Sequence, residues 1–154
     1  MAKISVTIEG LSEFASAIKK EPTVAVNELS KAVAKSIIQI HREAVLEAPV
    51  NKQPGEKGNL RKQIRSGMIS KLSGAVISNA NYSAAVHEGS RPHIIQSTGP
   101  WPLRNKRTGQ VFGRIVHHPG TRPNPFFIRA IQKSSKKVEG FFELAMTNLL
   151  KSLT

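Results

Sequence analysis

Histidine and glutamate side chains near the middle of the chain could support metal binding or proton transfer. His87 and Glu88 are adjacent, and further histidines follow at His93, His117 and His118. Imidazole and carboxylate groups are common zinc ligands and common general acids and bases. The spacing of these residues matches no zinc-binding pattern, and the chain contains no cysteine. We therefore expect no metal site, and a metal-dependent nuclease or hydrolase built on His87, Glu88, His117 and His118 is only a third hypothesis.

Other catalytic signatures are also missing from the sequence. Serines are numerous, but the chain has no Gly-x-Ser-x-Gly nucleophile elbow and no glycine-rich phosphate-binding loop. Adjacent helical residues such as His87 and Glu88 point about 100° apart, so they do not face each other as an acid/base pair. The sequence therefore predicts no catalytic residue, no cofactor and no enzymatic activity.

The stretch that contains the first of these residues, Asn81 to Ser90, predicts a short helix. Asn81 is expected to cap its start, and Gly89 is expected to end it with a left-handed backbone conformation. Glu88 would then lie at the C-terminal end, where the helix dipole disfavours a negative charge. The functional interpretation is an ion pair that fixes a subunit contact, and the alternative is a solvated glutamate. The candidate partners are Arg91, Arg114, Arg122 and Arg129.

Composition and charge limit the class of protein. A length of 154 residues with 39% hydrophobic content predicts a single domain, residues 1–154. The 23 basic residues against 10 acidic residues give a net charge of +13, which favours nucleic acid or an acidic protein surface as a partner. With one Tyr and one Trp for base stacking, a sequence-specific nucleic-acid reader is not expected. The N-terminus lacks the apolar run of a signal peptide or membrane span, so we expect no membrane partner.

Hydrophobic periodicity predicts the elements of the first half. Residues 3–9 alternate as a strand does, residues 11–18 follow a short helical pattern, and residues 23–46 predict a long helix. Two strands, 68–72 and 75–78, are expected to join through a Ser73-Gly74 turn. The apolar stripe of the long helix comprises Val26, Leu29, Val33, Ile37, Ile40 and Ala44.

A basic loop is expected at residues 48–60, where Pro, Gly, Lys and Asn are frequent. It is interpreted either as an arm that faces a polyanion or as a solvated loop that its charge keeps soluble. The candidate polyanion-facing residues are Lys52, Lys57, Arg61, Lys62 and Arg65.

The second half is expected to carry a long extension at residues 91–122, followed by a final helix from Pro125 to about Leu153. A strand at 110–116 and a turn at 107–109 predict a hairpin inside the extension. Trp101 either is exposed as an interface anchor or covers a sheet edge. The core-facing stripe of the final helix is Phe127, Ile131, Val138, Phe142, Ala145 and Leu149. The predicted fold class is α+β, with a small antiparallel sheet packed against two long helices and long loop or hairpin extensions.

Four short motifs occur in a fixed order along the chain. A long helix ends in Ala48-Pro49, Gly58-Asn59-Leu60-Arg61 follows, residues 82–90 read Tyr-Ser-Ala-Ala-Val-His-Glu-Gly-Ser, and residues 123–127 read Pro-Asn-Pro-Phe-Phe before Ala130. With this order the chain resembles the tail-completion or neck proteins of tailed bacteriophages, the family named after the tenth-gene product of a lambdoid coliphage. The resemblance covers about residues 10–131. Lys57 and Ser90 stand where the family usually has threonine.

The resemblance implies a structural virion protein at the head-tail junction, assembled in the host cytoplasm. Such a subunit would act in a homo-oligomeric ring with other neck and tail proteins, and would help join the completed tail to the DNA-filled head. Transient contact with packaged DNA is expected, and the alternative function is nonspecific DNA binding through the basic loop. The subunit-interface or fold-defining candidates are Tyr82, Glu88, Gly89, Arg91, Trp101, Arg122, Pro125, Phe126 and Phe127.

Overall fold

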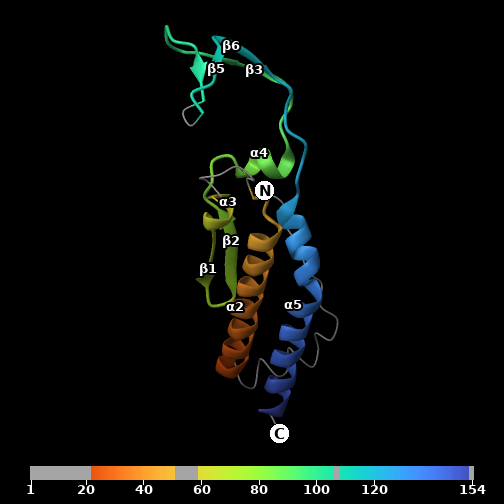
Figure 1. Cartoon of the computed structure of the whole chain (residues 1–154). Helices are drawn as coiled ribbons and strands as arrows, with labels where there is room; N and C mark the ends of the chain where they lie inside the picture. Colours follow the sequence, from red (N-terminus) through yellow and green to blue (C-terminus); the bar gives the residue numbers. More distant parts are fainter. Residues whose placement is uncertain (1–21, 51–58, 106–107, 153–154) are drawn as a thin grey trace. The chain divides into compact units, whose positions relative to one another are not determined.

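The computed structural model describes residues 22–50, 59–105 and 108–152, and its fold is α+β as predicted (Figure 1). The strand and short helix expected within residues 3–18 lie outside the described residues. Contacts divide the chain into two units. Unit 1 combines residues 1–79 with 127–154, and unit 2 comprises residues 80–126. The single domain stays a prediction, and each unit is described by itself.

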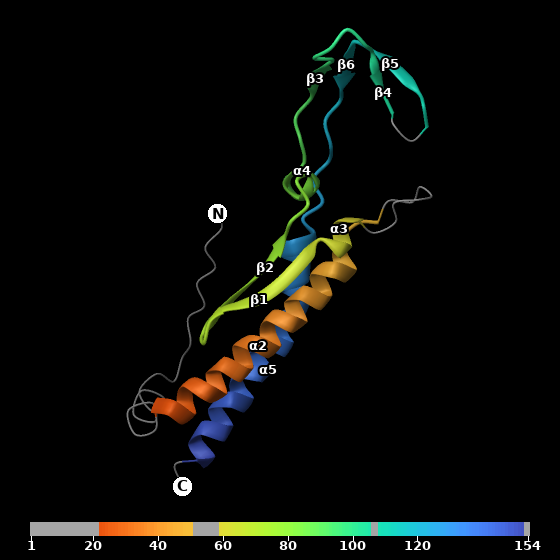
Figure 2. The same cartoon turned by 90° about the vertical axis from the view of Figure 1, so that its left-hand side faces the viewer.

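Two long helices form the frame of unit 1. Helix α2 (Pro22–Glu47) and helix α5 (Phe126–Lys151) lie side by side and run in opposite directions (Figures 1 and 2). Both were predicted, with boundaries within about two residues. Pro22 begins α2, where its missing N–H costs no helical hydrogen bond, and Pro49 follows soon after its end.

Helix α2 buries two faces, of which the sequence pattern indicated only one. In the predicted stripe, Ile37 and Ala44 are buried and the remaining residues are half-buried. The second face holds the small residues Ala25, Ala32 and Ser36, all buried. Ala130, Ser134 and Ala145 are likewise buried on α5, together with Phe126 and Leu149. Small side chains add little apolar surface, so their burial leaves no hydrophobic stripe in the sequence.

A β-hairpin packs on α2 within unit 1, as Figure 2 shows. Strand β1 (Ile64–Ser70) pairs antiparallel with β2 (Ser73–Ser78), and the short helix α3 (Asn59–Lys62) precedes β1. The predicted turn at Ser73-Gly74 was wrong, because Lys71 and Leu72 form it. The Ser70 and Ser73 hydroxyls lie 2.7 Å apart across the turn, and Ser70 Oγ also accepts from the Leu72 N–H at 3.3 Å.

Gly74 serves close packing rather than the turn. A Cβ at this position would collide with the Ile37 side chain of α2 and would lie 2.8 Å from the Gly67 carbonyl oxygen. Glycine in a strand often marks such a close approach. The hairpin therefore rests on α2 at a position where no side chain fits.

Unit 2 consists of the helix α4 (Ser83–Glu88) and two short two-stranded antiparallel sheets. Strand β3 (His93–Gln96) pairs with β6 (Ile115–His118), and β4 (Leu103–Arg104) pairs with β5 (Val111–Gly113). A bridge between Ser90 and Thr121 closes the base. Residues 90–121 are called the arm here. The predicted strand at 110–116 is divided by a bend at Arg114, and β3 was not predicted.

No helix in the described part of the chain is long and apolar enough to cross a membrane.

Candidate functional site

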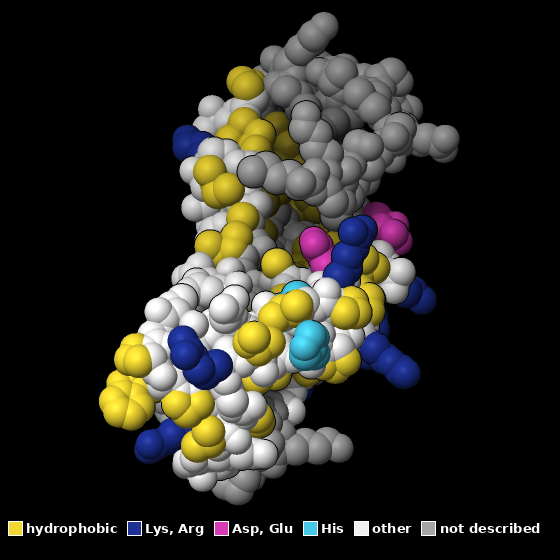
Figure 3. Space-filling model, turned by 90° about the horizontal axis from the view of Figure 1, so that it is seen from above, with side chains coloured by type: hydrophobic (Ala, Val, Ile, Leu, Met, Phe, Trp, Pro, Cys, Tyr) yellow, Lys and Arg dark blue, Asp and Glu magenta, His cyan; other side chains and the backbone are white. Residues whose placement is uncertain are grey.

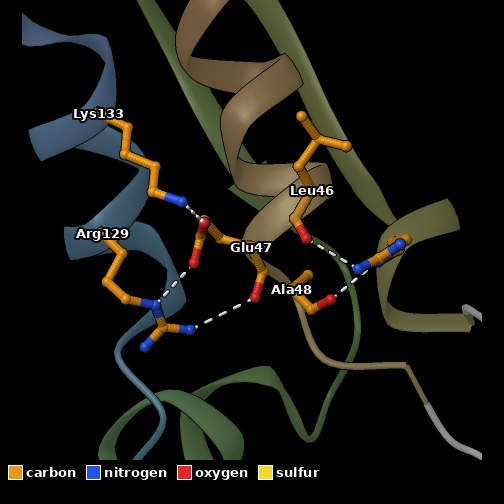
Figure 4. A network of polar contacts seen from close by, with 6 residues as sticks. Leu46, Glu47, Ala48, Arg129 and Lys133 are labelled. Carbon is orange, nitrogen blue, oxygen red and sulfur yellow. Dashed lines mark hydrogen bonds and ion pairs between the residues drawn. The ribbon is translucent and has the colours of Figure 1, made fainter.

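The first cluster of motif residues lies at the C-terminal end of α2 in unit 1. Arg61 donates from Nε to the Ala48 carbonyl oxygen at 2.8 Å, and from its terminal nitrogen to the Leu46 carbonyl oxygen at 2.8 Å (Figure 4). Leu60 and Ala48 are buried beside it. The last carbonyl groups of a helix have no partner within the helix, so a guanidinium placed there both satisfies them and complements the helix dipole. The Asn59-Leu60-Arg61 motif therefore caps the long helix.

Glu47 joins the two long helices at the same end of unit 1. Its carboxylate accepts from Lys133 Nζ at 2.5 Å and from Arg129 Nε at 2.7 Å, while Arg129 also reaches the Glu47 carbonyl oxygen at 3.4 Å (Figure 4). The hydrogen bond from Lys133, and then the one from Arg129, lowers the pKa of the Glu47 carboxyl below its ordinary value of 4.5. Arg129, one of the expected partners of Glu88, thus pairs with Glu47, a residue that the sequence analysis did not single out.

The second cluster of motif residues lies in unit 2, where the end of α4 meets the segment before α5. The Asn124 N–H donates to the Val86 carbonyl oxygen at 3.0 Å, and the His87 ring meets the Phe126 ring edge-on at 5.5 Å. Phe126 is fully buried, whereas Phe127, which was predicted to face the core, is half-buried. Two motifs separated by more than thirty residues in the sequence are therefore in contact.

Gly89 has the positive φ that the sequence predicted, with a different ψ. Its φ is 80° and its ψ is 178°, which is extended rather than left-handed helical. A Cβ here would lie 2.6 Å from the Thr121 carbonyl oxygen. Gly120, which precedes the bridge residue Thr121 on the other segment, also has a positive φ of 88°, and a Cβ there would collide with the Ser90 carbonyl oxygen. The two glycines let the strands at the base of the arm approach each other.

Two expectations for the central helix differ from the structure. Tyr82, not Asn81, occupies the N-cap position of α4, and its side chain makes no capping hydrogen bond. Glu88 is exposed, and no ion pair joins it to a described residue of unit 2. Arg122 is exposed, and α5 begins at Phe126, directly after Pro125. Within the described residues of its unit, Glu88 therefore has no ion-pair partner, because the short helix leaves the carboxylate in solvent.

Two histidines of the arm, His93 and His118, form a stacked pair. His93 and His118 are paired across β3 and β6, and their rings stack with centroids 4.9 Å apart. His93 Nδ1 donates to the Arg91 carbonyl oxygen at 2.9 Å, and His118 Nδ1 accepts from the Gly120 N–H at 3.1 Å. In neutral His118 this leaves the proton on Nε2, which therefore offers no lone pair to a metal. No group of three metal-binding side chains occurs among the described residues.

Trp101 is exposed, which is one of the two states that the sequence left open. Its side chain is 78% exposed, in the segment between β3 and β4. The backbone of this segment is fixed by Ser97, whose hydroxyl donates to the Trp101 carbonyl oxygen at 2.5 Å, while the Ser97 N–H donates to the Arg114 carbonyl oxygen at 2.9 Å. The exposed tryptophan is therefore presented by a hydrogen-bonded loop.

The arm carries exposed apolar and basic side chains together. Seen from above, the space-filling view shows hydrophobic side chains spread over the visible face, with lysine or arginine side chains among them (Figure 3). The exposed arginines include Arg91, Arg104 and Arg114. The large exposed apolar residues of the arm are Ile94, Ile95, Trp101, Val111, Phe112 and Ile115. Apart from Trp101, these residues were not singled out from the sequence, where most of them stand in short apolar pairs without a clear alternation.

Arg61, one of the predicted polyanion-facing residues, has a structural role instead. Arg61 is half-buried and directed at the end of α2, so it does not face a polyanion. Lys62 and Arg65 are exposed, whereas Lys52 and Lys57 lie outside the described residues.

A cleft of about 230 Å³ opens between α2 and α5. Glu28 lines it, and its carboxylate accepts hydrogen bonds from Lys31 at 2.5 Å and Asn148 at 3.0 Å. These bonds, the one from Lys31 first, lower the pKa of Glu28. The carboxylate stabilises the helix pair and offers no free general base.

Comparison of the chain with protein-family models, with curated proteins and with solved structures gave no match.

Proposed function

We propose that this protein is a structural subunit of the neck of a tailed bacteriophage. It acts in a ring that completes the tail and joins it to the DNA-filled head, and it performs no catalytic step. The observation that carries the proposal is the position of the residues behind the resemblance. Arg61 caps α2 in unit 1, and the Val86 to Gly89 turn contacts Asn124 and Phe126 in unit 2. The residues behind the resemblance therefore make contacts that hold the fold, as expected of a family's fold-defining motifs.

Exposed apolar side chains on the hairpin of unit 1 support an assembling role. Ile69 is 75% exposed, and Met68, Leu72 and Ile77 of the same hairpin are also exposed. Exposed apolar surface is typical of protein–protein contacts, and among the described residues each strand of the hairpin pairs on one side only. A ring of identical subunits needs such a surface on each copy, in contact with a different surface of the next copy.

The alternative function, nonspecific DNA binding through the basic loop, is weaker than the sequence suggested. Arg61 stabilises α2, which leaves Lys62 and Arg65 as the exposed basic residues of the described part of that run.

The proposal is tested by the protein content of purified virions. Particles are banded by density, stripped of loosely bound protein and analysed by quantitative mass spectrometry. We expect this chain at a fixed copy number per particle, comparable to that of other neck proteins. Absence from infectious particles would refute the proposal.

A further inference from the structure

The charged residues of the arm are all of one sign, positive. No acidic residue occurs between Glu88 and Glu139, whereas residues 90–121 contain four arginines and one lysine. No carboxylate of its own sequence neutralises the arm, so its positive potential is local and does not simply reflect the net charge of the chain. A surface of this kind attracts a polyanion.

The described arginines of the arm stand on a fixed backbone. The Arg91 carbonyl oxygen accepts from His93 Nδ1, and the Arg114 carbonyl oxygen accepts from the Ser97 N–H. Arg104 belongs to β4 and pairs with Val111 of β5. All three side chains are exposed. Their charges therefore project from ordered positions, which favours repeated contacts along a regular polyanion.

The β3–β6 ribbon presents a face of mixed character. Ile94 opposes His117, and Gln96 opposes Ile115. Residues directly opposite each other, and residues two apart in one strand, share a face of a sheet. This face therefore holds two exposed aliphatic side chains together with an amide and an imidazole. Amide and imidazole groups can hydrogen-bond base edges or phosphates, while aliphatic groups contact sugars and thymine methyl groups.

The width of the two-stranded ribbon fits the groove of one kind of nucleic-acid duplex better than another. Paired strands lie about 4.8 Å apart, and the major groove of B-form DNA, about 12 Å wide, admits a two-stranded ribbon. The major groove of A-form RNA is deep and too narrow for side chains to read. Duplex DNA therefore fits this arm better than duplex RNA.

From the charge, the width and the mixed face together, we propose that the arm lies in a groove of duplex DNA. Arg91, Arg104 and Arg114 contact phosphates, and the Ile94 face meets the groove floor. Trp101 touches the sugar-phosphate wall. The binding does not depend on base sequence. This inference goes beyond the proposed function, since it concerns the isolated protein and holds whether or not the protein acts in a phage neck.

A second copy of the chain is the competing occupant of the apolar face. Two arms placed together would bring arginines of like charge close to one another, and like charges across an interface oppose association. DNA contact instead releases the counterions held by the phosphates. The charge of the arm therefore favours DNA.

Trp101, the single tryptophan of the chain, reports directly on the arm. The full-length protein is titrated with a 30-base-pair DNA duplex of mixed sequence at 50 to 200 mM salt. Tryptophan fluorescence and the anisotropy of labelled DNA are recorded together. We expect both signals to change at the same DNA concentration, and duplex RNA to bind more weakly. DNA binding without a change at Trp101, or no DNA binding at 50 mM salt, would overturn the proposal.

A charge-matched pair of variants locates the contact. Arg104→Gln with Arg114→Gln removes two arm charges, and Lys136→Gln with Lys137→Gln removes two exposed charges of α5. Loss of two phosphate contacts reduces the slope of log K against log salt by about 1.8, which corresponds to about 200-fold weaker binding at 50 mM and about 20-fold at 200 mM salt. We expect this loss for the arm variant and a much smaller change for the α5 variant.

Equal losses in the two variants would show diffuse attraction and overturn the proposal. Two results together would assign the face to a second copy instead. Trp101 fluorescence would change with protein concentration in the absence of DNA, and the arm variant would bind DNA as tightly as the unmodified protein. Helix content measured by circular dichroism verifies that both variants are folded.

Discussion

Gly89 is the residue whose conformation the sequence predicts most directly. Its φ of 80° is rarely adopted by other residues, and a Cβ would meet the backbone oxygen of Thr121. We expect Gly89→Ala to destabilise unit 2 by about 1–3 kcal/mol, because both the strain and the clash involve backbone. Urea unfolding followed by Trp101 fluorescence, which reports on unit 2, measures the change.

Gly140 supplies the matched control. It lies inside α5 with open space around a Cβ and no positive φ. Gly140→Ala is therefore expected to stabilise the helix by roughly 0.5–1 kcal/mol. Equal effects of the two substitutions would contradict the strain assigned to Gly89.

Glu47 makes the stability of unit 1 depend on pH. Its pKa is lowered in the folded state, so below about pH 5 the unfolded chain binds more protons than the folded one. The contribution of Glu47 is fully present above its unfolded value and is lost as the pH falls through its folded pKa. We expect Glu47→Gln to lower the thermal midpoint at pH 7 and to reduce the difference in midpoint between pH 7 and pH 4. Thermal melts at pH 7 and pH 4 measure the two midpoints, with Glu139→Gln as an exposed control. An unchanged difference in midpoint in Glu47→Gln would contradict the role assigned to Glu47.

Among the elements, the end of α2 is capped by Arg61 of α3, and Arg129 of α5 adds a longer hydrogen bond to the Glu47 carbonyl oxygen. Arg61→Gln removes two charge-assisted hydrogen bonds from a half-buried position, and we expect a loss of about 1–3 kcal/mol in the free energy of unfolding. Arg61→Lys should rescue little, because one ammonium group cannot replace a forked guanidinium. Chemical unfolding followed by circular dichroism at 222 nm measures the loss.

Lys62, the exposed neighbour of Arg61, is the control for this prediction. Lys62→Gln should leave the free energy of unfolding unchanged within about 0.5 kcal/mol. If Lys62→Gln destabilised the protein as much as Arg61→Gln, the capping role of Arg61 would be wrong.

The long helices could be predicted from the sequence because 3.6-residue periodicity extends over many residues. The second buried face of α2 could not, since its residues Ala25, Ala32 and Ser36 give little hydrophobic signal. The hairpin turn was misplaced because Gly74 was interpreted as a turn residue, although it is required for close packing against Ile37. Strand β3 could not be predicted because it has only four residues and two adjacent isoleucines, which give no alternating pattern.

The candidate site was only partly predictable. Positive φ at Gly89 follows from local sequence, and the structure confirms it, whereas the sequence left the exposure of Trp101 open. The partner of Arg129 could not be predicted, because Glu47 lies 82 residues away in the chain. Arg61 was interpreted by its charge alone, whereas its function depends on the helix end that the fold places beside it.

At the scale of the whole molecule, the two units carry different surfaces. The hairpin of unit 1 exposes apolar side chains, which suit contacts between subunits, and the arm of unit 2 combines apolar and basic side chains, which suit DNA. A neck subunit needs both kinds of contact, because a ring is closed by its subunits and encloses the DNA that leaves the head. The proposed function and the proposed arm contact are therefore compatible but separately testable.

Complementation in an extract tests the central claim most directly. Purified protein is added to a lysate of phage in which the gene for this chain is disrupted, and joined particles are counted by negative-stain microscopy. We expect separate heads and tails without the protein, and joined, infectious particles after its addition. Joined particles that form equally well without the protein would contradict its assignment to the neck.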